Sequence, residues 1–435
     1  MNFVNGKVIS EEACQGILEN IDTMIFETLK KPPLDINLVI EACDVMVKNI
    51  ESLDVVKRLP DLGISPVLAE IYIGQVARMF SGQAIRERLK LELGMDYDKP
   101  KEIVYTYSGA KAAQMYTPLG VLFHITAGNM DVLPFVSLLE GLLCGNINIV
   151  KLPKEEQGIT VSLLEELMKI QPALKEYVYA FDYSSKDIYA MKRLADVSDA
   201  IVVWGGDEAI KAVRTMANPN TKIIEWGHKI SFAYVTKSGV SKENLRKLAL
   251  NICLTNQLFC SSCQGVFLDT EDMEDVYAFC REFLPVLEEV SRENPFAFDE
   301  GTKLFTSARV TLELYHQEIE ARGTDIQIFR GENCSIVASK DNRLETSIMY
   351  RNIWVKPLKY EEILGLRRYK NYLQTAALLC GSHEYDDLAN KLMRAGVVKV
   401  SDGFEMSNYA AGEAHDGVFA LRCYVKLASV QGHLF

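Results

Sequence analysis

The chain has 435 residues, of which 48% are apolar and 9% aromatic, with 47 Lys and Arg against 59 Asp and Glu. This length allows roughly two or three domains with hydrophobic cores, and the composition excludes a disordered chain, a collagen and a coiled coil. The net charge of -12, without any Lys/Arg-rich block, argues against nucleic-acid binding, because a polyanion needs a concentrated basic face.

The cysteines and the apolar runs predict the compartment. Ten cysteines are scattered from Cys14 to Cys423, and the N-terminus lacks the charged start and apolar stretch of a signal peptide. We therefore expect a cytoplasmic protein with reduced thiols. Apolar runs such as residues 120–125 and 135–143 are shorter than the about 20 residues that cross a bilayer, so no membrane span is expected.

The N-terminal quarter is expected to be helical, because apolar residues recur at helical spacing through residues 11–95. The pattern changes at residues 101–116, where an alternating run surrounds Ser108-Gly109 and predicts a projecting hairpin. With a C-terminal strand near residues 422–429, this hairpin would form an oligomerisation arm, and we expect a dimer or tetramer.

Between residues 120 and 224, short β-branched runs alternate with longer helical patterns. Runs that are apolar throughout are typical of parallel strands covered by helices on both faces, and dinucleotide binding is the leading use of such a layer. The expected strands are 120–125, 147–152, 178–181, 200–203 and 222–224. A second α/β domain is expected after a boundary near Trp226, with strands at 232–235, 265–268, 336–338, 353–355, 375–379 and 397–400.

The segment with most chemistry is residues 255–264, Thr-Asn-Gln-Leu-Phe-Cys-Ser-Ser-Cys-Gln, just before an apolar strand. A turn with free backbone N–H groups favours a nucleophilic thiolate at Cys260, although free cysteines are also among the most buried residues. Cys260 and Cys263 form a C-x-x-C pair, which would suit redox chemistry or half of a zinc site. Because no second pair and no paired His lie nearby, no metal is expected.

Polar residues also follow the predicted strands of the first layer. The Asn129 amide could donate to an oxyanion or simply form a turn, and Lys151 could contact a ribose or its 2'-phosphate or be solvated. Residues 204–207, Trp-Gly-Gly-Asp, lead from a strand into a helix, where backbone N–H groups meet phosphate, but they lack G-x-G-x-x-G. Glu225 ends the next strand as a general base or an ion-pair member.

Taken in order, these segments resemble the aldehyde dehydrogenase superfamily, and more closely the LuxC-type acyl-CoA reductases, the fatty-acid reductases of bacterial bioluminescence. The resemblance rests on residues 118–129, 145–151, 203–207, 256–262 and 414–417. It implies two Rossmann-type α/β domains with an oligomerisation arm. The NAD(P)-binding domain would comprise residues 1–100 and 117–226, the catalytic domain 227–412, and the arm 101–116 and 413–435.

The resemblance also implies roles for single residues. Cys260, not Cys263, would be the nucleophile, with the Asn129 amide and the Cys260 backbone N–H holding the oxyanion. Glu225 stands in Glu-Trp-Gly-His-Lys where aldehyde dehydrogenases have Glu-Leu-Gly-Gly-Lys, and would donate a proton or hold the loop. The implied nucleotide-binding residues are Thr126, Ala127, Gly128, Lys151, Trp204, Gly205, Gly206 and Asp207. His415 looks LuxC-like without an assigned role, and the family's Glu-Ile-Phe-Gly-Pro ribose segment has no clear counterpart.

The implied activity is reduction of an acyl-CoA or other acyl thioester, expected to be fatty, to an aldehyde through a covalent Cys260 acyl-enzyme. NADPH is the expected cofactor, with NADH as the alternative, and an acyl-protein synthetase is the partner implied by resemblance. A second reading, kept open by Glu225, is NAD(P)-dependent oxidation of an aldehyde to an acid or acyl-CoA. A third is a non-catalytic acyl-carrying or scaffold subunit.

Overall fold

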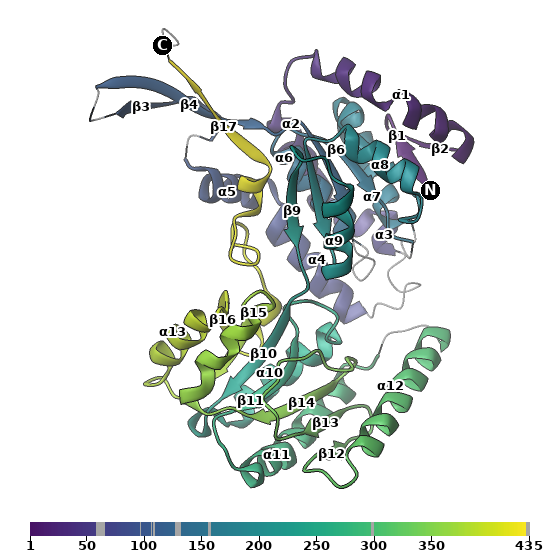
Figure 1. Cartoon of the computed structure of the whole chain (residues 1–435). Helices are drawn as coiled ribbons and strands as arrows, with labels where there is room; N and C mark the ends of the chain where they lie inside the picture. Colours follow the sequence, from purple (N-terminus) through teal and green to yellow (C-terminus); the bar gives the residue numbers. More distant parts are fainter. Residues whose placement is uncertain are drawn as a thin grey trace. The chain divides into compact units, whose positions relative to one another are not determined.

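The computed structural model describes residues 1–57, 66–95, 97–105, 107, 109–126, 132–154, 158–296 and 300–431. The chain divides into two compact units (Figure 1). The first comprises residues 1–58, 70–227 and 410–435, and the second residues 59–69 and 228–409. In the described segments, no helix combines the length and the apolar character needed to span a bilayer.

The first unit is built on a seven-stranded sheet with the order β2-β1-β7-β6-β5-β8-β9. Its parallel part confirms the strands predicted between residues 120 and 224: β5 (Val121–Ile125), β6 (Ile147–Lys151), β7 (Val178–Phe181), β8 (Ala200–Trp204) and β9 (Lys222–Trp226). The expectation of a purely parallel sheet is wrong at one edge, where β1 (Asn2–Val4) and β2 (Lys7–Ile9) add antiparallel strands. Three-residue strands are too short to show a periodic pattern.

Helices cover this sheet, and the predicted helical N-terminal segment is confirmed within the described residues. Its helices are α1 (Glu11–Leu29), α2 (Ile36–Lys48), α3 (Asp54–Lys57), α4 (Pro66–Phe80) and α5 (Gly82–Leu93). The crossover helices are α6 (Leu133–Leu143), α7 (Ile159–Ile170), α8 (Ile188–Asp196) and α9 (Asp207–Met216). Helix α1 shows why the segment folds locally: Ser10 caps it by accepting from the Ala13 N–H, and its apolar stripe packs into the core of the sheet.

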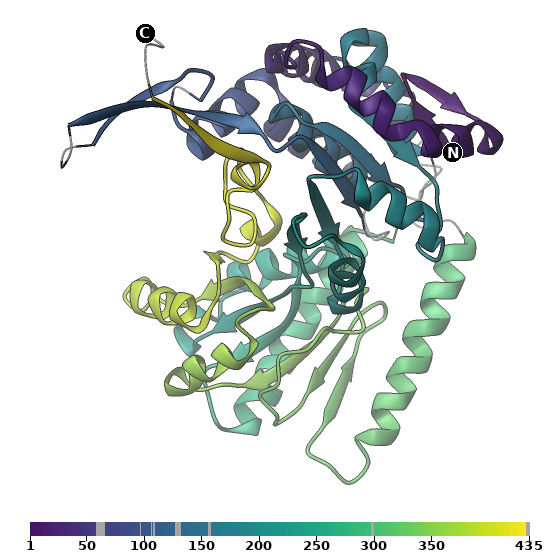
Figure 2. The same ribbon diagram turned by 45° about the horizontal axis from the view of Figure 1, so that its top comes forward.

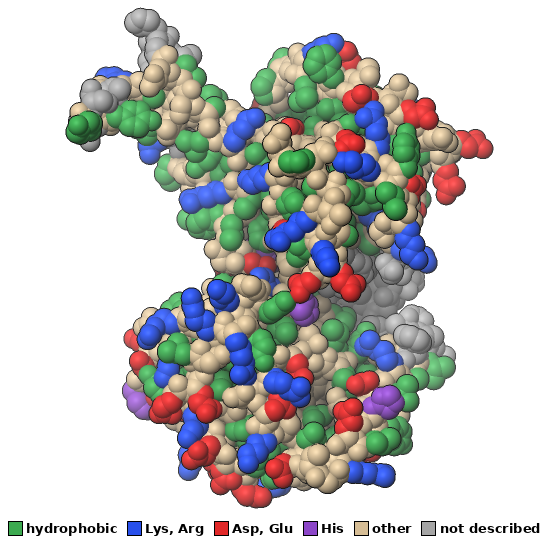
Figure 3. Space-filling model, viewed as in Figure 1, with side chains coloured by type: hydrophobic (Ala, Val, Ile, Leu, Met, Phe, Trp, Pro, Cys, Tyr) green, Lys and Arg blue, Asp and Glu red, His purple; other side chains and the backbone are tan. Residues whose placement is uncertain are grey.

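A three-stranded antiparallel sheet forms an arm on the first unit (Figure 1). The predicted hairpin is confirmed as β3 (Lys101–Tyr105) and β4 (Ala110–Pro118), and β17 (Val425–Val430) pairs with β4. The C-terminal strand begins later than expected, because the short helix α14 (Ala420–Cys423) precedes it. Large apolar side chains remain exposed on this arm, and Figure 3 shows hydrophobic side chains on its surface. The exposed residues are Val104, Tyr105, Tyr107, Met115, Leu427 and Val430.

The second unit contains the other seven-stranded sheet, with the order β12-β13-β14-β11-β10-β15-β16. The expected strands are present as β10 (Ile230–Val235), β11 (Cys263–Leu268), β13 (Ser335–Ala338), β14 (Asn352–Pro357), β15 (Leu373–Leu379) and β16 (Lys399–Ser401). All of these pair in parallel, and the unpredicted β12 (Gln327–Arg330) adds an antiparallel edge.

The principal helices of the second unit are α10 (Lys242–Thr255), α11 (Met273–Glu293), α12 (Glu300–Glu320) and α13 (Tyr385–Ala395), with a 3-10 segment at Tyr360–Tyr369. Figure 2 shows α12 beside the β12 edge of the sheet, where Arg330 pairs with Glu318 of the helix. Helices α10 and α11 pack on one face of the sheet and enclose the core that lies behind the cysteine segment. Because β10 pairs in parallel with β11 and β15, the amino ends of these three strands lie at the same edge of the sheet.

Candidate active site

The cysteine segment is a loop between α10 and β11. Helix α10 ends at Asn256 in the left-handed conformation, with φ 46°, and Gln257 follows with φ 62°. Non-glycine residues adopt this region at a cost, and surrounding contacts must hold them there. The loop then brings the Cys260 side chain to the surface and returns to the buried strand β11.

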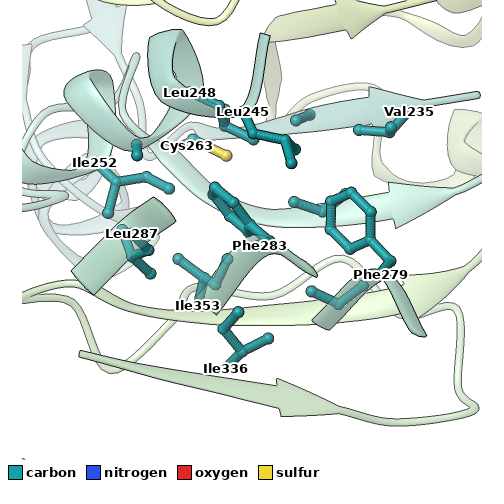
Figure 4. Close-up of a cluster of buried hydrophobic side chains, with 14 of the residues drawn as sticks. Val235, Leu245, Leu248, Ile252, Cys263, Phe279, Phe283, Leu287, Ile336 and Ile353 are labelled. Carbon is teal, nitrogen blue, oxygen red and sulfur yellow. The ribbon is translucent and has the colours of Figure 1, made fainter. Parts of the chain in front are cut away.

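The two cysteines of the C-x-x-C pair lie in opposite environments. Cys260 is the one exposed thiol of the ten cysteines, all of which lie in the described part of the chain. Cys263 is fully buried, and Figure 4 shows it among Leu245, Leu248 and Phe283. This burial raises the pKa of Cys263 to about 12, because a thiolate is poorly solvated there. Burial also raises the pKa of each of the eight remaining thiols.

A buried glutamine holds the loop from within. Gln257 is 1% exposed, and its Nε2 donates to the carbonyl of Cys263 at 3.0 Å, to Ser347 Oγ at 3.0 Å and to the carbonyl of Asn352 at 3.2 Å. Its Oε1 accepts from the Arg351 backbone N–H at 2.8 Å. One side chain therefore joins the cysteine loop to the segment that precedes β14.

That segment is strained in the same way as the cysteine loop. Met349, Tyr350 and Arg351 have φ of 65°, 51° and 71°. With Asn256 and Gln257 they account for five of the seven non-glycine residues with positive φ in the described part of the chain. The Tyr350 N–H donates to the Asn256 carbonyl at 3.1 Å, so the two strained segments support each other.

The buried Arg351 side chain locks this second segment. Its NH1 donates to the carbonyl and hydroxyl of Ser291, its NH2 donates to the carbonyl of Asn294, and its Nε donates to Asn256 Oδ1 at 3.3 Å. The guanidinium also lies 3.8 Å from the centre of the Phe296 ring. The cysteine loop thus rests on a rigid frame, as a positioned nucleophile requires.

Two residues of neighbouring strands contact Cys260 directly. Ser231 of β10 donates through its Oγ to the Cys260 carbonyl at 2.7 Å, and Gln374 of β15 donates through Nε2 to the Cys260 sulfur at 3.4 Å. Gln374 is 1% exposed and Ser231 is fully buried. Neither belongs to a recognisable motif, and sequence reasoning missed both.

The predicted nucleotide-binding residues lie in the first unit, at the carboxyl ends of its parallel strands. Thr126 follows β5 and its hydroxyl donates to the carbonyl of Lys151, which ends β6. Both side chains are mostly buried. Ala127, Gly128 and Asn129 lie outside the described residues. Ligands of open α/β sheets bind at this end of the strands, and Thr126 and Lys151 lie together there.

The Trp-Gly-Gly-Asp turn joins β8 to α9 as predicted. Gly206 is the residue before α9, and no side chain caps the helix. A Cβ at Gly206 would meet no atom within 4 Å, so there is open space beside the turn that starts α9. Asp207 and Glu208 occupy that first turn.

A chain of hydrogen bonds between buried side chains holds the indole of Trp204. Its indole Nε1 donates to Ser137 Oγ at 3.0 Å, and Ser137 Oγ lies 2.7 Å from His124 Nδ1. Nε2 of this histidine lies 3.0 Å from Asn148 Oδ1. Because Ser137 accepts from the indole and the Asn148 oxygen only accepts, the pattern assigns the His124 proton to Nε2. Burial lowers the pKa of His124 to about 4, so the ring is neutral.

An aromatic cluster lies at the same strand ends. The ring of Trp204 stacks on that of Trp226 with 5.4 Å between centroids, and His415 lies 5.4 Å from Trp204 and 5.1 Å from Trp226. Sequence reasoning noticed His415 without assigning it a place. The pairing of Trp204 with Trp226 in the β8–β9 register could have been foreseen from their positions at two neighbouring strand ends.

Glu225 lies near the end of β9 and forms a bidentate ion pair with Arg214 of α9, at 2.5 and 2.8 Å. Of the two roles that the sequence left open, general base or ion-pair member, this geometry favours the second. Within the described residues, no group of three or more His, Cys, Asp or Glu side chains is arranged to hold a metal ion.

Solved structures identify the fold as that of the aldehyde dehydrogenases. The chain matches NAD+-bound betaine aldehyde dehydrogenase from Staphylococcus aureus with a TM-score of 0.67 and 16% identity, over 91% of this chain and 82% of that one. A lactaldehyde dehydrogenase matches with a TM-score of 0.67 and 16% identity, over 99% of this chain and 95% of that one. At such identities the likeness establishes the fold.

Sequence comparison identifies the family. Residues 36–427 match the family described as Acyl-CoA reductase (LuxC), and the chain belongs to it. The long-chain acyl-protein thioester reductase of Aliivibrio fischeri is 24% identical over 318 residues, which are 72% of this chain and 64% of that protein. Its namesake from Vibrio harveyi is 22% identical over 375 residues, 85% of this chain and 75% of that protein. The match to the first relative thus spans less than two thirds of its length.

Proposed function

We propose that this protein reduces a fatty acyl thioester to the free aldehyde, with Cys260 as the nucleophile. The observation that carries the proposal is the exposure of Cys260 on a rigid, strained loop, while the other nine cysteines are buried or half-buried. A nucleophile must reach its substrate, and its thiolate must be accessible at neutral pH.

The proposed chemistry has three steps: transfer of the acyl group to Cys260, reduction of the resulting thioester, and release of the aldehyde. The Cys260 thiolate attacks the acyl carbonyl, a new S–C bond forms, and the original thiol leaves with a proton. A reduced nicotinamide, held by Thr126, Lys151 and the Trp204–Asp207 turn, would supply the hydride for reduction of the Cys260 thioester. The sulfur then departs from this carbon as the aldehyde forms, and a proton restores the thiol. The oxyanion would be held by the Cys260 backbone N–H and by Asn129, as the family resemblance implies.

The first unit supports the nucleotide part of this proposal. The carboxyl ends of β5, β6 and β8 carry Thr126, Lys151 and the Trp204–Asp207 turn, and no side chain caps the start of α9. These features fit a dinucleotide. We propose NADPH over NADH because Lys151 ends the second strand of the nucleotide-binding unit, where its positive side chain would pair with a 2'-phosphate.

The relatives named above act on long-chain acyl-protein thioesters, and we propose the same class of substrate here, with acyl-CoA as the soluble donor. An acyl-protein synthetase would then be the partner that loads the acyl group. We further propose a cytoplasmic homo-oligomer joined through the β3, β4 and β17 arm, whose exposed apolar side chains would be covered by another copy.

Glu225 is not required for the transfer of the acyl group to Cys260 or for the release of the aldehyde. Both of its carboxylate oxygens accept from Arg214, so the proposal leaves it in the ion pair. Hydrolysis of the acyl-enzyme would need a free base near the thioester. Aldehyde oxidation to an acid is therefore the less supported direction.

The decisive experiment mixes the purified protein with myristoyl-CoA, with and without NADPH. Without NADPH, intact-mass and peptide analysis should show one acyl increment on Cys260; with NADPH, its absorbance at 340 nm should fall as aldehyde appears. The Cys260→Ala variant should do neither. An acyl increment without aldehyde from either nicotinamide would favour the acyl-carrying subunit, and turnover only from aldehyde with NAD(P)+ would favour the oxidase.

A further inference from the structure

The contact between Gln374 and the Cys260 sulfur lies beside a register irregularity. Ile230 and Phe232, two positions apart on β10, pair with Leu373 and Ala376, three positions apart on β15. The extra residue of β15 therefore falls where Gln374 lies. Irregularities of this kind occur next to active sites, where they re-aim a side chain.

The same level of β10 is irregular on its other side. Ser231 and Ala233 pair with Cys263 and Val266 of β11, so that strand also carries an extra residue. The result is a local gap in regular pairing around Ser231, directly under the cysteine loop. Ser231 fills this gap by accepting from the Thr375 N–H at 3.1 Å and donating to the Cys260 carbonyl at 2.7 Å.

We propose that Gln374 is a second catalytic residue, whose side-chain amide donates a hydrogen bond to the Cys260 sulfur and stabilises the thiolate that attacks the acyl carbonyl. This inference rests on the proposed function, since it concerns the same nucleophile. An amide N–H at 3.4 Å favours the charged form of sulfur over the neutral thiol. Because Gln374 is buried to 99% and belongs to a strand, the donor is fixed before substrate arrives.

The backbone of Cys260 is fixed by a different group from its sulfur. Ser231 Oγ holds the carbonyl at 2.7 Å and Gln374 contacts the sulfur, while the contact between Ser231 Oγ and Gln374 Oε1 is longer, at 3.5 Å. Loss of Gln374 should therefore change the charge state of the sulfur more than the position of the loop. If Gln374 only supported the structure, its loss would not change the charge state of the Cys260 sulfur in this selective way.

The test measures alkylation of Cys260 by iodoacetamide, in which a sulfur–carbon bond forms and iodide leaves, across pH 5 to 10. Peptide mass analysis identifies Cys260 as the modified residue. In Gln374→Leu the midpoint should rise by about one pH unit, making alkylation at pH 7 about tenfold slower. The rate at high pH, where every Cys260 is a thiolate, should match the parent protein.

Thr375→Val is the matched control. Its hydroxyl has no hydrogen-bond partner in the described structure, it is buried, and it follows Gln374 on the same strand. This variant should keep the parent midpoint. Should Gln374→Leu fail to fold, Gln374→Glu, which is nearly the same size and replaces the donor by a carboxylate, should raise the midpoint at least as far.

An unchanged midpoint in the folded Gln374 variants would overturn the proposal, as would an equal shift in Thr375→Val. Alkylation needs neither acyl thioester nor nucleotide. A shifted midpoint in a protein that reduces no acyl thioester would therefore uphold the role of Gln374 and reject the proposed function, whereas acyl reduction with an unshifted midpoint would do the reverse.

Discussion

Arg214 donates to both carboxylate oxygens of Glu225, from Nε at 2.5 Å and from NH2 at 2.8 Å. The pair joins α9 to β9, and the Arg214 side chain is 63% exposed. Because solvent screens such an exposed pair, it is a local brace more than a source of stability.

The first prediction follows from this pair. Glu225→Gln should retain acyl reduction within about threefold of the parent, because a general acid or base would cost 100-fold or more. Arg214→Met, which breaks the same pair from the other side, should have an equally small effect on steady-state NADPH oxidation. A large loss confined to Glu225→Gln would instead assign the carboxylate to the chemistry.

The second prediction separates the two cysteines of the C-x-x-C pair. Cys260→Ala should abolish acyl reduction while leaving the urea midpoint unchanged, because Cys260 is exposed. Cys263→Ala should keep the activity but lower the free energy of unfolding by about 1–2 kcal/mol, because it opens a small cavity in packed hydrocarbon. Loss of activity in a folded Cys263 variant would contradict this assignment.

The third prediction concerns acid stability. The pKa of His124 falls from 6.5 to about 4 on folding, so between these values the unfolded chain binds a proton that the folded chain excludes. Stability should therefore fall as the pH is lowered from 6.5 to 4, by roughly 3 kcal/mol from this group. Urea unfolding at several pH values should show a shallower acid loss in His124→Gln, which cannot titrate. If the free energy of unfolding fell equally steeply with pH in the two proteins, the assigned role of His124 would be refuted.

The fourth prediction tests the buried glutamine that ties the cysteine loop to the next segment. Gln257→Leu leaves the carbonyls of Cys263 and Asn352 without their donor, and should lower the free energy of unfolding by about 2–4 kcal/mol. Gln83→Met, at an exposed position on α5, is the control and should change it by less than about 0.5 kcal/mol. Comparable losses in both would mean that the loop is not held as described.

The fifth prediction concerns the arm. Replacing Val104 and Leu427, which are 50% and 52% exposed, by Lys should shift the molar mass measured by light scattering toward the monomer, because two charges would enter the proposed interface. Leu29→Lys, at an equally exposed apolar position on α1, should leave the mass unchanged. A monomeric parent protein would remove the basis of this prediction.

Much of the sheet architecture was predictable because buried parallel strands are apolar throughout. The strand around residues 121–125 and its partners show this plainly. The antiparallel edges at β1, β2 and β12 were not foreseen, because all three strands are short, and β2 and β12 are also partly exposed. Their pairing depends on which sheet edge lies free, which no local pattern records.

The candidate site was only partly predictable. Cys260 could be singled out because its segment combines small polar residues with an approaching strand. Ser231 and Gln374 could not, because they lie 29 residues before and 114 residues after Cys260, and they meet it through strand register alone. Arg351 could not be singled out either, because it is also far from the cysteine loop in the sequence.

The left-handed residues of the cysteine loop and of the segment before β14 hold one another, although about 90 positions of sequence separate them. Anyone transplanting this reactive thiol into another protein scaffold would therefore have to move two pieces of chain together. The cysteine loop alone would relax toward ordinary backbone angles, and the grafted sulfur would no longer be held in its orientation.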